Sequence, residues 1–538
     1  MSPSSTPYFL TTPIYYVNDS PHIGHAYTSL ACDVIARFLR SEGSEVMFLT
    51  GTDEHGQKVE KSAKQHNLDP QKFVDEVSKR FRKLSELMDF SNDDFIRTTE
   101  ARHIKSCQAL WKRISDGKTP NGQDSNIYLG KYDGWYSVRD EAFYDESELI
   151  KDTKNPSNYL APTGASVEWV EEPSYFFRLS AWQDKLLEFY ENNPEFVAPQ
   201  SRRNEVISFV KGGLRDLSIS RTSFSWGIPV PDDDSHIMYV WLDALTNYIT
   251  GINFPEITSD KWNKYWPASL HMVGKDILRF HAVYWPAFLM SAGIEPPQRV
   301  FAHGWWTNEG QKISKSLGNV IDPEVIVRKY GVDAVRYFLL REVPFGNDGY
   351  FSHASMVTRI NKDLANDFGN LAQRVLSMIS KNFEGVIPYP QKNAECNFKS
   401  FETLSLSQNL LSKVSPLIHK QAFNEALDRI WEVVREANRS IDKDEPWKLK
   451  KKNKSGMGTI LWLQAETIRN LAIILKPFMP QSMDRLLDQL NIPLDERNIV
   501  NLHEDNEGDI CQKYSLRPDS KLPKPVAIFP KYICEFED

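Results

Sequence analysis

Cysteine is scarce in this sequence, and the spacing of the few that are present excludes two kinds of framework. The 538 residues contain five cysteines, none of them in a Cys-x-x-Cys pair: Cys32, Cys107, Cys396, Cys511 and Cys534. This excludes a disulfide scaffold and a zinc knuckle built from cysteine pairs, and it is typical of a reducing compartment.

An excess of positive charge and a long apolar run are also missing. Lys and Arg number 64 against 72 Asp and Glu, so the net charge is -8 and any contact with nucleic acid requires a local patch. The apolar run 471–475 ends at Lys476, whereas a bilayer span needs about 20 apolar residues. No Lys or Arg precedes Arg37, so neither a secretory signal nor a transit peptide is indicated. We expect a soluble protein without membrane contact, in the cytoplasm or, as a mature form, in an organelle matrix.

The start of the chain predicts a β-α-β unit. Residues 8–17 are rich in aromatic and β-branched types and predict a strand, and Asn-Asp-Ser-Pro at 18–21 supplies cap residues for a helix that begins near Pro21. Apolar residues then recur every three or four positions until Glu42-Gly43, and a second strand is expected at 46–50. Similar strands at 270–273 and 300–303 are each followed by glycine. The fold class is therefore α/β, with a Rossmann-type parallel sheet.

Two further regions differ from this alternation. Residues 117–176 hold clusters of Gly, Pro, Asn and aromatic residues, which predict a small β-rich insertion. From about residue 355 the pattern is helical, and one apolar stripe predicts a helical bundle: Phe423, Leu427, Ile430, Val434, Ala437 and Ile441. The expected domains are a sheet domain in two halves, 1–116 and 177–305, the insertion 117–176, a connecting region 306–354 and the helical domain 355–538.

The segment His22-Ile23-Gly24-His25 stands at the predicted N-terminus of the first helix. The free N–H groups of a helix N-terminus favour an anion, and Gly24 would leave space for a nucleotide near the backbone. A plainer alternative is that both histidines only cap or pack the helix.

A second segment, Lys312-Ile313-Ser314-Lys315-Ser316, carries two lysines three residues apart beside hydroxyl groups. Such a cationic loop suits a triphosphate, although lysine-rich loops are commonly no more than solvated surface.

Together the two segments resemble the HIGH and KMSKS signatures of class I aminoacyl-tRNA synthetases, with Ile313 in place of Met. Three more motifs are similar to those of the methionyl-tRNA synthetases: Gly51-Thr-Asp-Glu-His-Gly56, Tyr239-Val-Trp-Leu-Asp-Ala244 and Gly274-Lys-Asp-Ile277. The five motifs occur in the family's order, and the resemblance covers nearly the whole chain. It implies a methionine-tRNA ligase, which activates L-methionine with ATP to methionyl-adenylate and transfers the methionyl group to tRNA(Met) in translation.

The resemblance also implies a role for individual residues. Catalysis is assigned to His22, His25, Lys312 and Lys315. ATP binding is assigned to the same four residues with Gly24, Gly304 and Ser314. Methionine binding is assigned to Ile14, Tyr16, Asp53, Trp241, Ala244, Tyr248, Asp276, Ile277 and His281, with Asp53 pairing with the ammonium group. Reading of the anticodon by the helical domain is assigned to Asn370, Arg374, Pro446 and Trp447.

Three details of this chain qualify the resemblance. The family commonly has proline after the alanine of the Trp-Leu-Asp-Ala motif, whereas Leu245 stands here, so that wall of the pocket would differ in shape. On the residues alone, the plainer interpretation is that Trp447 is a core residue, and the lysines of 448–454 could be a solvated face or a phosphate contact. Many relatives bind zinc in the connective insertion, but Ser137, Asp140, Ala161 and Gly164 occupy the matching positions, so no structural zinc is expected.

ATP with Mg²⁺ is the expected cofactor, and a monomer is the expected state.

Four alternatives were open on the sequence. Cysteinyl-tRNA synthetases use zinc thiolates, and no cysteine except Cys32 stands near the motifs in the chain. Small nucleotidylyltransferases share His-x-Gly-His, but they are much shorter. A non-catalytic RNA-binding paralogue would be expected to have lost the histidines or lysines. A nicotinamide-dependent enzyme needs G-x-G-x-x-G after the first strand, which is missing.

Overall fold

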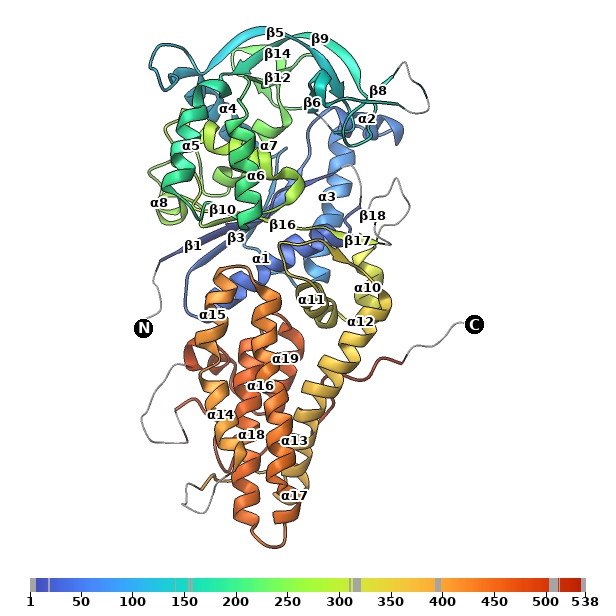
Figure 1. Ribbon diagram of the computed structural model, residues 1–538, viewed down its shortest axis with the longest axis vertical. Coiled ribbons are helices and arrows are strands. Elements are labelled where there is room, and N and C mark those ends of the chain that lie inside the picture. The colour runs from blue at the N-terminus through green and yellow to red at the C-terminus, as the bar shows by residue number, and fades with distance from the viewer. Residues whose placement is uncertain are drawn as a thin grey trace.

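The molecule consists of an α/β part and a long helical bundle, placed end to end (Figure 1). The computed structural model describes residues 6–17, 20–140, 142–152, 155, 158–308, 311–312, 321–391, 398–502, 511 and 513–533. Within these ranges no helix is both long enough and apolar enough to cross a membrane.

A parallel sheet forms the centre of the α/β part. Seven strands of the described chain pair in the order β10 (Val197–Ala198), β16 (Val300–His303), β15 (Leu270–Gly274), β1 (Tyr8–Thr11), β3 (Val46–Asp53) and β2 (Tyr15–Tyr16), with β4 (Asp94–Arg97) also on β3. Each of these pairs is parallel. Every residue of β3 and β16 is buried, as expected where helices cover both faces of a sheet. The Rossmann-type sheet predicted from the sequence is confirmed.

The first helix, α1 (Ile23–Ser41), follows the predicted apolar stripe and ends at Glu42 as expected. Its N-cap is His22, whereas the sequence pattern favoured the preceding Asn-Asp-Ser segment, of which Asn18 and Asp19 lie outside the described residues. The strand expected over 8–17 is divided into β1 and β2, because Pro13 stands between them and has no N–H for a sheet.

The remaining helices of the α/β part are short to medium in length. They are α2 (Gln57–Gln65), α3 (Pro70–Leu87), α4 (Ala101–Asp116), α5 (Gln183–Asn192), α6 (Gln200–Lys211), α7 (Val240–Thr250), α8 (Asp260–Tyr265) and α9 (Trp285–Ser291). A π-helical turn, Phe280–Tyr284, precedes α9, and a 3-10 turn, Lys275–Ile277, follows β15.

The insertion folds as an antiparallel sheet at the upper end of Figure 1. Its order is β11 (Leu217–Ser218), β9 (Glu168–Phe177), β5 (Ile127–Ser137) and β6 (Ala142–Tyr144). A small pair, β7 (Ile150–Lys151) and β8 (Tyr159–Leu160), and a three-stranded sheet of β12 (Ser220–Arg221), β14 (Asp233–Met238) and β13 (Pro229–Val230) complete this region. The β-rich character expected for 117–176 is therefore present, and β11 joins its sheet from further along the chain.

The helical part begins after a small connecting sheet. That sheet pairs β17 (Trp306–Asn308) with β18 (Gln311–Lys312) and β19 (Gly349–Tyr350), and α10 (Pro323–Tyr330) and α11 (Val332–Arg341) lie between them in the chain. The bundle contains α12 (His353–Arg359), a π-helical segment (Ile360–Gly369), α13 (Asn370–Asn382), α14 (Lys399–Gln408), α15 (Leu411–His419), α16 (Phe423–Asp444), α17 (Pro446–Leu449), α18 (Lys454–Leu475) and α19 (Pro480–Gln489). All six residues of the predicted stripe on α16 are fully buried, which confirms the bundle. The central helix, α18, is buried on every side from Gly456 to Leu475.

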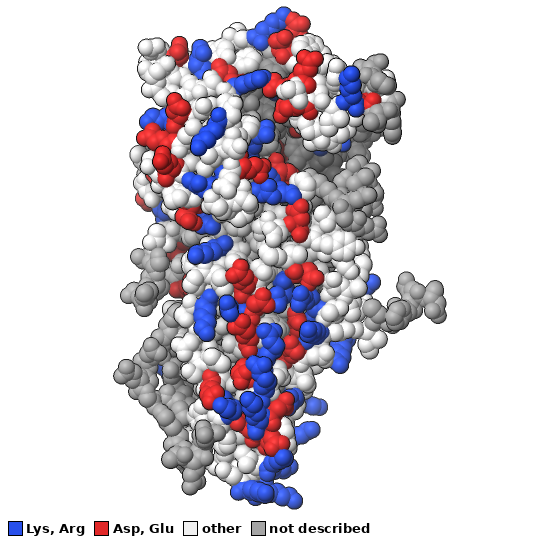
Figure 2. Space-filling model, viewed as in Figure 1, with Lys and Arg blue, Asp and Glu red and all other residues white. Residues whose placement is uncertain are grey.

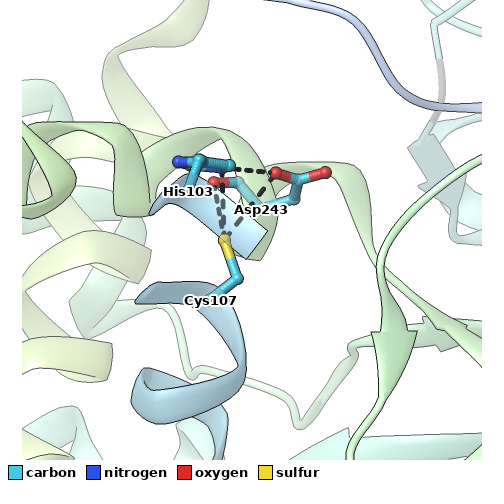
Figure 3. A group of neighbouring side chains, drawn as sticks. All are labelled: His103, Cys107 and Asp243. Carbon is cyan, nitrogen blue, oxygen red and sulfur yellow. Dashed lines mark hydrogen bonds and ion pairs between the residues drawn. The ribbon is translucent and has the colours of Figure 1, made fainter. Parts of the chain in front are cut away.

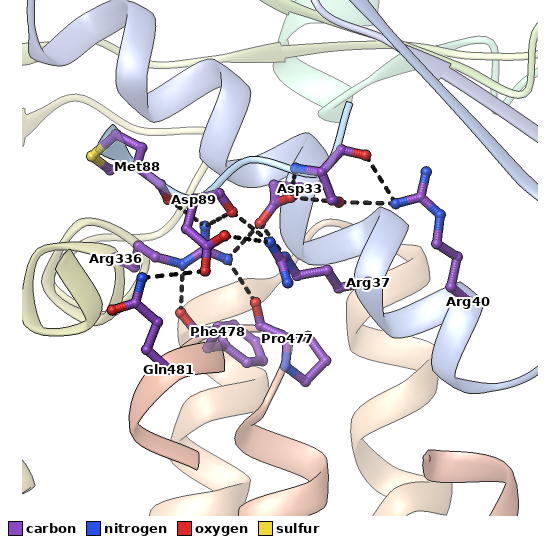
Figure 4. A network of polar contacts seen from close by, with 10 residues as sticks. Asp33, Arg37, Arg40, Met88, Asp89, Arg336, Pro477, Phe478 and Gln481 are labelled. Carbon is purple, nitrogen blue, oxygen red and sulfur yellow. Dashed lines mark hydrogen bonds and ion pairs between the residues drawn. The ribbon is translucent and has the colours of Figure 1, made fainter. Parts of the chain in front are cut away.

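A buried ion pair joins the two parts of the molecule (Figure 4). Arg336 on α11 and Asp33 on α1 are fully buried, and Nη2 of Arg336 lies 2.6 Å from Oδ2 of Asp33. The same guanidinium donates to the carbonyl oxygens of Phe478 at 2.9 Å and Pro477 at 2.8 Å, at the end of α18, and of Met88 at 3.0 Å, at the end of α3. Burial alone would raise the pKa of Asp33, but Arg336 and Arg37 lower it overall.

The substitution Arg336→Met is expected to destabilise the protein strongly. It leaves the Asp33 carboxylate buried without its main partner, and losing one member of a buried pair costs about 3–5 kcal/mol. Denaturant unfolding measures this loss. Arg429→Met is the control, because Arg429 pairs with Glu432 where both side chains are about half exposed, and such pairs contribute less than about 1 kcal/mol. Equal losses in both variants would contradict the prediction.

Candidate active site

A cavity of about 390 Å³ opens at the carboxyl ends of the central strands. Asp53, Gly274 and His303 are the last residues of β3, β15 and β16, and all three line it. The cavity brings together twelve residues that the sequence assigned to one site: Ile14, Tyr16, His22, Gly24, His25, Asp53, Trp241, Ala244, Tyr248, Asp276, Ile277 and His281.

The other four residues assigned to this site are Gly304, Lys312, Ser314 and Lys315. Ser314 and Lys315 lie outside the described residues, and only the backbone of Lys312, in β18, is described. Gly304 does not line the cavity, although its neighbours His303 and Trp305 do. A Cβ atom at Gly304 would stand 2.1 Å from the carbonyl oxygen of Asn347, so the close approach of that backbone explains the glycine.

His22 and His25 form a reciprocal cap on the first turn of α1. Nδ1 of His22 accepts from the N–H of Gly24 at 3.1 Å, and Nδ1 of His25 accepts from the N–H of His22 at 3.0 Å. In each neutral ring the proton is therefore on Nε2, which makes that nitrogen a donor. A Cβ atom at Gly24 would lie 2.9 Å from Cε1 of His22, so the close ring of His22 explains the glycine, which also lines the cavity.

Buried neutral histidines support the apolar side of the cavity. Nδ1 of His281 donates to the carbonyl oxygen of Ile277 at 2.9 Å, and Nε2 of His281 accepts from the hydroxyl of Tyr248 at 2.6 Å. Burial lowers the pKa of His281 to about 4. The ring of Tyr248 also stacks on His271, 4.1 Å between centroids, and burial holds the pKa of His271 well below its usual value.

Trp241 and Trp305 bring two aromatic faces to the cavity wall. Trp241 stacks on Phe280 with 3.7 Å between ring centroids. Trp305, which the sequence analysis did not assign, donates from Nε1 to Oδ1 of Asp276 at 3.1 Å, and Lys275 Nζ lies 4.2 Å from the centre of its ring. Because Trp305 directly follows Gly304, which was assigned to ATP binding, its position in the sequence could have indicated that it lies in the site.

Thr28 and His303 are also in the lining and were also missed. Oγ1 of Thr28 lies 2.7 Å from Nε2 of His303, while Nδ1 of His303 donates to the carbonyl oxygen of Gly304 at 2.7 Å. Burial lowers the pKa of His303. Thr28 is one turn after Gly24 on α1, so both lie on the same face of the helix. This spacing could have indicated that Thr28 lies in the cavity wall.

The insertion reaches the cavity through Arg139 and Asp140, which line it. Both follow Ser137, whose hydroxyl accepts from the N–H of Asp140 at 3.2 Å. The Asp140 carboxylate accepts from the hydroxyls of Tyr144, at 3.0 Å, and Thr163, and Arg139 donates to the carbonyl oxygen of Thr163 at 2.7 Å. Hydrogen bonds thus join the two turns in which the family's zinc ligands would stand, and the absence of zinc stays a prediction.

Asp243 and His103 lie behind this cavity, together with a cysteine (Figure 3). Among the described residues, His103, Cys107 and Asp243 form the one group with metal-ligating atoms close together. Burial raises the pKa of the Cys107 thiol well above its usual value, and both oxygens of Asp243 accept from histidine N–H groups, so hydrogen bonds account for the cluster. Cys107 is far from the motifs in the chain, but α4 carries it to Asp243 in the folded protein.

The residues assigned to the anticodon lie together at the far end of the bundle. Asn370 begins α13 and is exposed, and Nη2 of Arg374, one turn later, pairs with Oδ1 of Asp442 near the end of α16 at 2.7 Å. Pro446 is buried, whereas the side chain of Trp447 is 44% exposed. The alternative that Trp447 is a core residue is therefore wrong.

Charge of both signs is mixed over the visible face of the bundle (Figure 2). On α16, Arg429 pairs with Glu432 and Arg439 with Glu436. The exposed lysines of 448–454 extend from α17 to the first residue of α18, and blue side chains predominate at that lower end of the molecule. A contact between this end and phosphates stays a prediction.

Comparison with known proteins gives consistent matches over the chain. A family model described as "tRNA synthetases class I (M)" matches residues 8–376. The methionine-tRNA ligase of Rickettsia bellii is 55% identical over 525 residues, 98% of this chain and 99% of that protein. That of Mesorhizobium japonicum is 53% identical over 526 residues, 98% of each.

Solved structures agree with these matches. Mycobacterium tuberculosis methionyl-tRNA synthetase in complex with methionyl-adenylate superposes with a TM-score of 0.91 at 48% identity, covering 98% of this chain and 100% of that one. The apo form of the same protein gives a TM-score of 0.86 at 45% identity, covering 99% of each chain.

The neutral state of His281 predicts a pH dependence of stability. Its folded-state pKa of about 4 lies below the ordinary 6.5, so its contribution is fully present above pH 6.5 and is lost as the pH falls from there to about 4. The loss is about 3 kcal/mol. In His281→Gln, which keeps an acceptor for Tyr248, the decline of the free energy of unfolding over this range should be smaller by that amount.

Denaturant unfolding at several pH values between 7 and 4 measures this difference. His66→Gln is the control, because His66 is exposed at the end of α2. A decline in His281→Gln as steep as in the unchanged protein would contradict the prediction.

Proposed function

Because the chain belongs to the methionyl-tRNA synthetases, a family of class I, we propose that the cavity at the sheet edge binds L-methionine and ATP through the residues described above. The chain is a methionine-tRNA ligase: L-methionine and ATP form methionyl-adenylate, and the methionyl group then passes to tRNA. The observation that supports the site most is that His22 and His25 share one cavity with Asp53 and Trp241. Family membership excludes three of the alternatives, and the full-length identity to methionine-tRNA ligases, with both motifs retained, argues against a non-catalytic paralogue.

The methionine side of the cavity combines one anion with an apolar and aromatic wall. The carboxylate of Asp53 would bind the substrate's ammonium group by a charge-assisted hydrogen bond. Trp241, Ala244 and the Tyr248–His281 pair would surround the thioether, for which an aromatic box is well suited. Leu245, which stands where the family commonly has proline, lines the same wall.

The ATP side relies on positioning and on charge. The methionine carboxylate attacks the α-phosphorus and pyrophosphate leaves, so no side chain has to act as a nucleophile or a general base. The Nε2 donors of His22 and His25 at the N-terminus of α1 would bind the phosphates, and Lys312 and Lys315 would stabilise the charge on pyrophosphate. Mg²⁺ would enter with ATP as part of the substrate, held mainly by phosphates and water.

The second half-reaction requires tRNA(Met), whose anticodon would be read far from the cavity. Single-stranded loops are the parts of RNA that proteins read by sequence, and a base can stack on an exposed indole such as that of Trp447. Asn370 and Arg374 lie at the same end of the bundle. The monomeric state and the cellular location stay predictions.

Replacing Lys315 by alanine tests the charge assigned to its loop. Adenylate formation, measured by methionine-dependent pyrophosphate exchange, is expected to fall by ~10²-fold or more, because leaving-group charge is no longer stabilised. Methionine binding should be nearly unchanged. Lys413→Ala, an exposed lysine of α15, is the control and should behave like the unchanged protein. Equal exchange rates in the two variants would refute the role of Lys315.

Trp447→Ala separates tRNA recognition from adenylate formation. Stacking on one base contributes ~1–3 kcal/mol, so the efficiency of tRNA charging should fall by about 5- to 150-fold. Pyrophosphate exchange should persist, since it needs no tRNA. Both activities are measured on the same preparation, with Leu494→Ala as the control for loss of an exposed apolar side chain. A parallel fall of both activities, or no change in charging, would show that Trp447 does not read the anticodon.

A further inference from the structure

Asp243 is a buried carboxylate directly behind the wall of the cavity. It stands in the first turn of α7 between Trp241 and Ala244, which both line the cavity, but it is itself only 1% exposed and is not part of the lining. Its contacts are therefore with the protein rather than with a substrate.

The two oxygens of Asp243 join α7 to two other elements. Oδ2 accepts from Nδ1 of His55 at 2.7 Å, and Oδ1 accepts from Nε2 of His103 at 2.7 Å. His55 comes two residues after Asp53, just past the end of β3, while His103 belongs to α4, which also carries Cys107 toward the same carboxylate (Figure 3). Asp243 thus connects the wall that faces the substrate's side chain with the segment that carries Asp53.

The charge of this carboxylate is retained despite its burial. Burial alone would raise the pKa of Asp243, but the contacts with His55 and His103 outweigh it and lower the pKa to about 2. Both hydrogen bonds are therefore charge-assisted, and such bonds are short and strongly directional.

The segment around Asp53 is fixed from the other side as well. Glu54 is fully buried and accepts from Nε and Nη2 of Arg97 at 2.7 and 2.9 Å and from the hydroxyl of Thr99 at 2.6 Å. Its carbonyl oxygen accepts from Nε1 of Trp226 at 2.7 Å. The neighbours of Asp53 on its C-terminal side are thus both held, one by Arg97 and one by Asp243.

We propose that Asp243 is a positioning residue for methionine: through His55 and His103 it sets the separation between Asp53 and the α7 wall of the cavity. The proposal rests on the methionine site proposed above, in which the substrate is held at its ammonium end by β3 and at its side chain by α7. A displacement of ~1 Å between two such groups can cost ~10²-fold in activity. Residues that orient the ligands of a metal site commonly change affinity or activity by ~10–100-fold when they are replaced, and we expect an effect of the same size for Asp243.

The test is the substitution Asp243→Asn in methionine-dependent pyrophosphate exchange. The amide group of Asn presents N–H to one of the two histidine donors, so one contact is lost while the shape is kept. The KM for methionine is expected to rise ~10–100-fold, while the KM for ATP stays nearly unchanged, because α1 carries the nucleotide side. A merely structural role would lower the melting temperature without separating the two constants.

Glu466→Gln is the matched control. Glu466 is a buried carboxylate on α18 that pairs with Arg469 at 2.6 Å in the bundle, away from the cavity. This variant should lose stability and keep both KM values.

A second variant, His55→Gln, decides the question if Asp243→Asn does not fold. The amide nitrogen of Gln matches Nε2 of histidine rather than the Nδ1 that bonds Asp243, so this contact is lost, and the KM for methionine should rise by ~10-fold, again without change for ATP. An unchanged KM for methionine, or an equal rise for both substrates, overturns the proposal. If the unchanged protein fails to exchange with methionine, the proposed methionine site itself is wrong, whereas a normal parent with normal variants refutes only the role of Asp243.

Discussion

The ion pair between Asp33 and Arg336 is the buried charge pair at the junction of the two parts of this molecule, within an apolar core that both parts share. Both charges are fully buried, and such a pair is stable only when the remaining donors and acceptors are satisfied. Here Arg336 also bonds the carbonyl oxygens at the end of α18, and Asp33 also accepts from Ser91 at 2.6 and 2.7 Å. Since Asp33 belongs to the helix whose first turn lines the cavity, one helix contacts both the proposed nucleotide side of the site and the bundle.

Hydrogen bonds organise the described surroundings of the cavity. On the insertion, Asp140 and Arg139 connect two turns through Thr163, and this places both residues in the lining. On the apolar side, His281 is neutral because protonation is costly in a buried site, and it can both donate and accept. Asp243, in contrast, remains ionised because two N–H donors face it.

The secondary structure of several segments and the motif residues of the site could be predicted well from the sequence. The spacing of apolar residues determined α1 and α16, and the strand at 46–50 and the glycines after the later strands determined the parallel sheet and its active edge. The motif residues from His22 to His281 were assigned to one site, and the structure places them around one cavity. These features depend on residues a few positions apart, or on motifs whose order in the chain is itself the signal.

Contacts between distant segments were decided only by the tertiary structure. Cys107 and Asp243 are separated by more than a hundred positions, and nothing in either segment indicates that α4 packs against α7. The exposure of Trp447 depends on how α16 ends, and the glycine at 304 depends on the backbone of Asn347. The sequence by itself determined the elements and the chemistry available to them, because periodicity and motifs are local. The packing of those elements determined which groups are buried, ionised and close enough to act together, because burial and long-range hydrogen bonds exist only once the chain has folded.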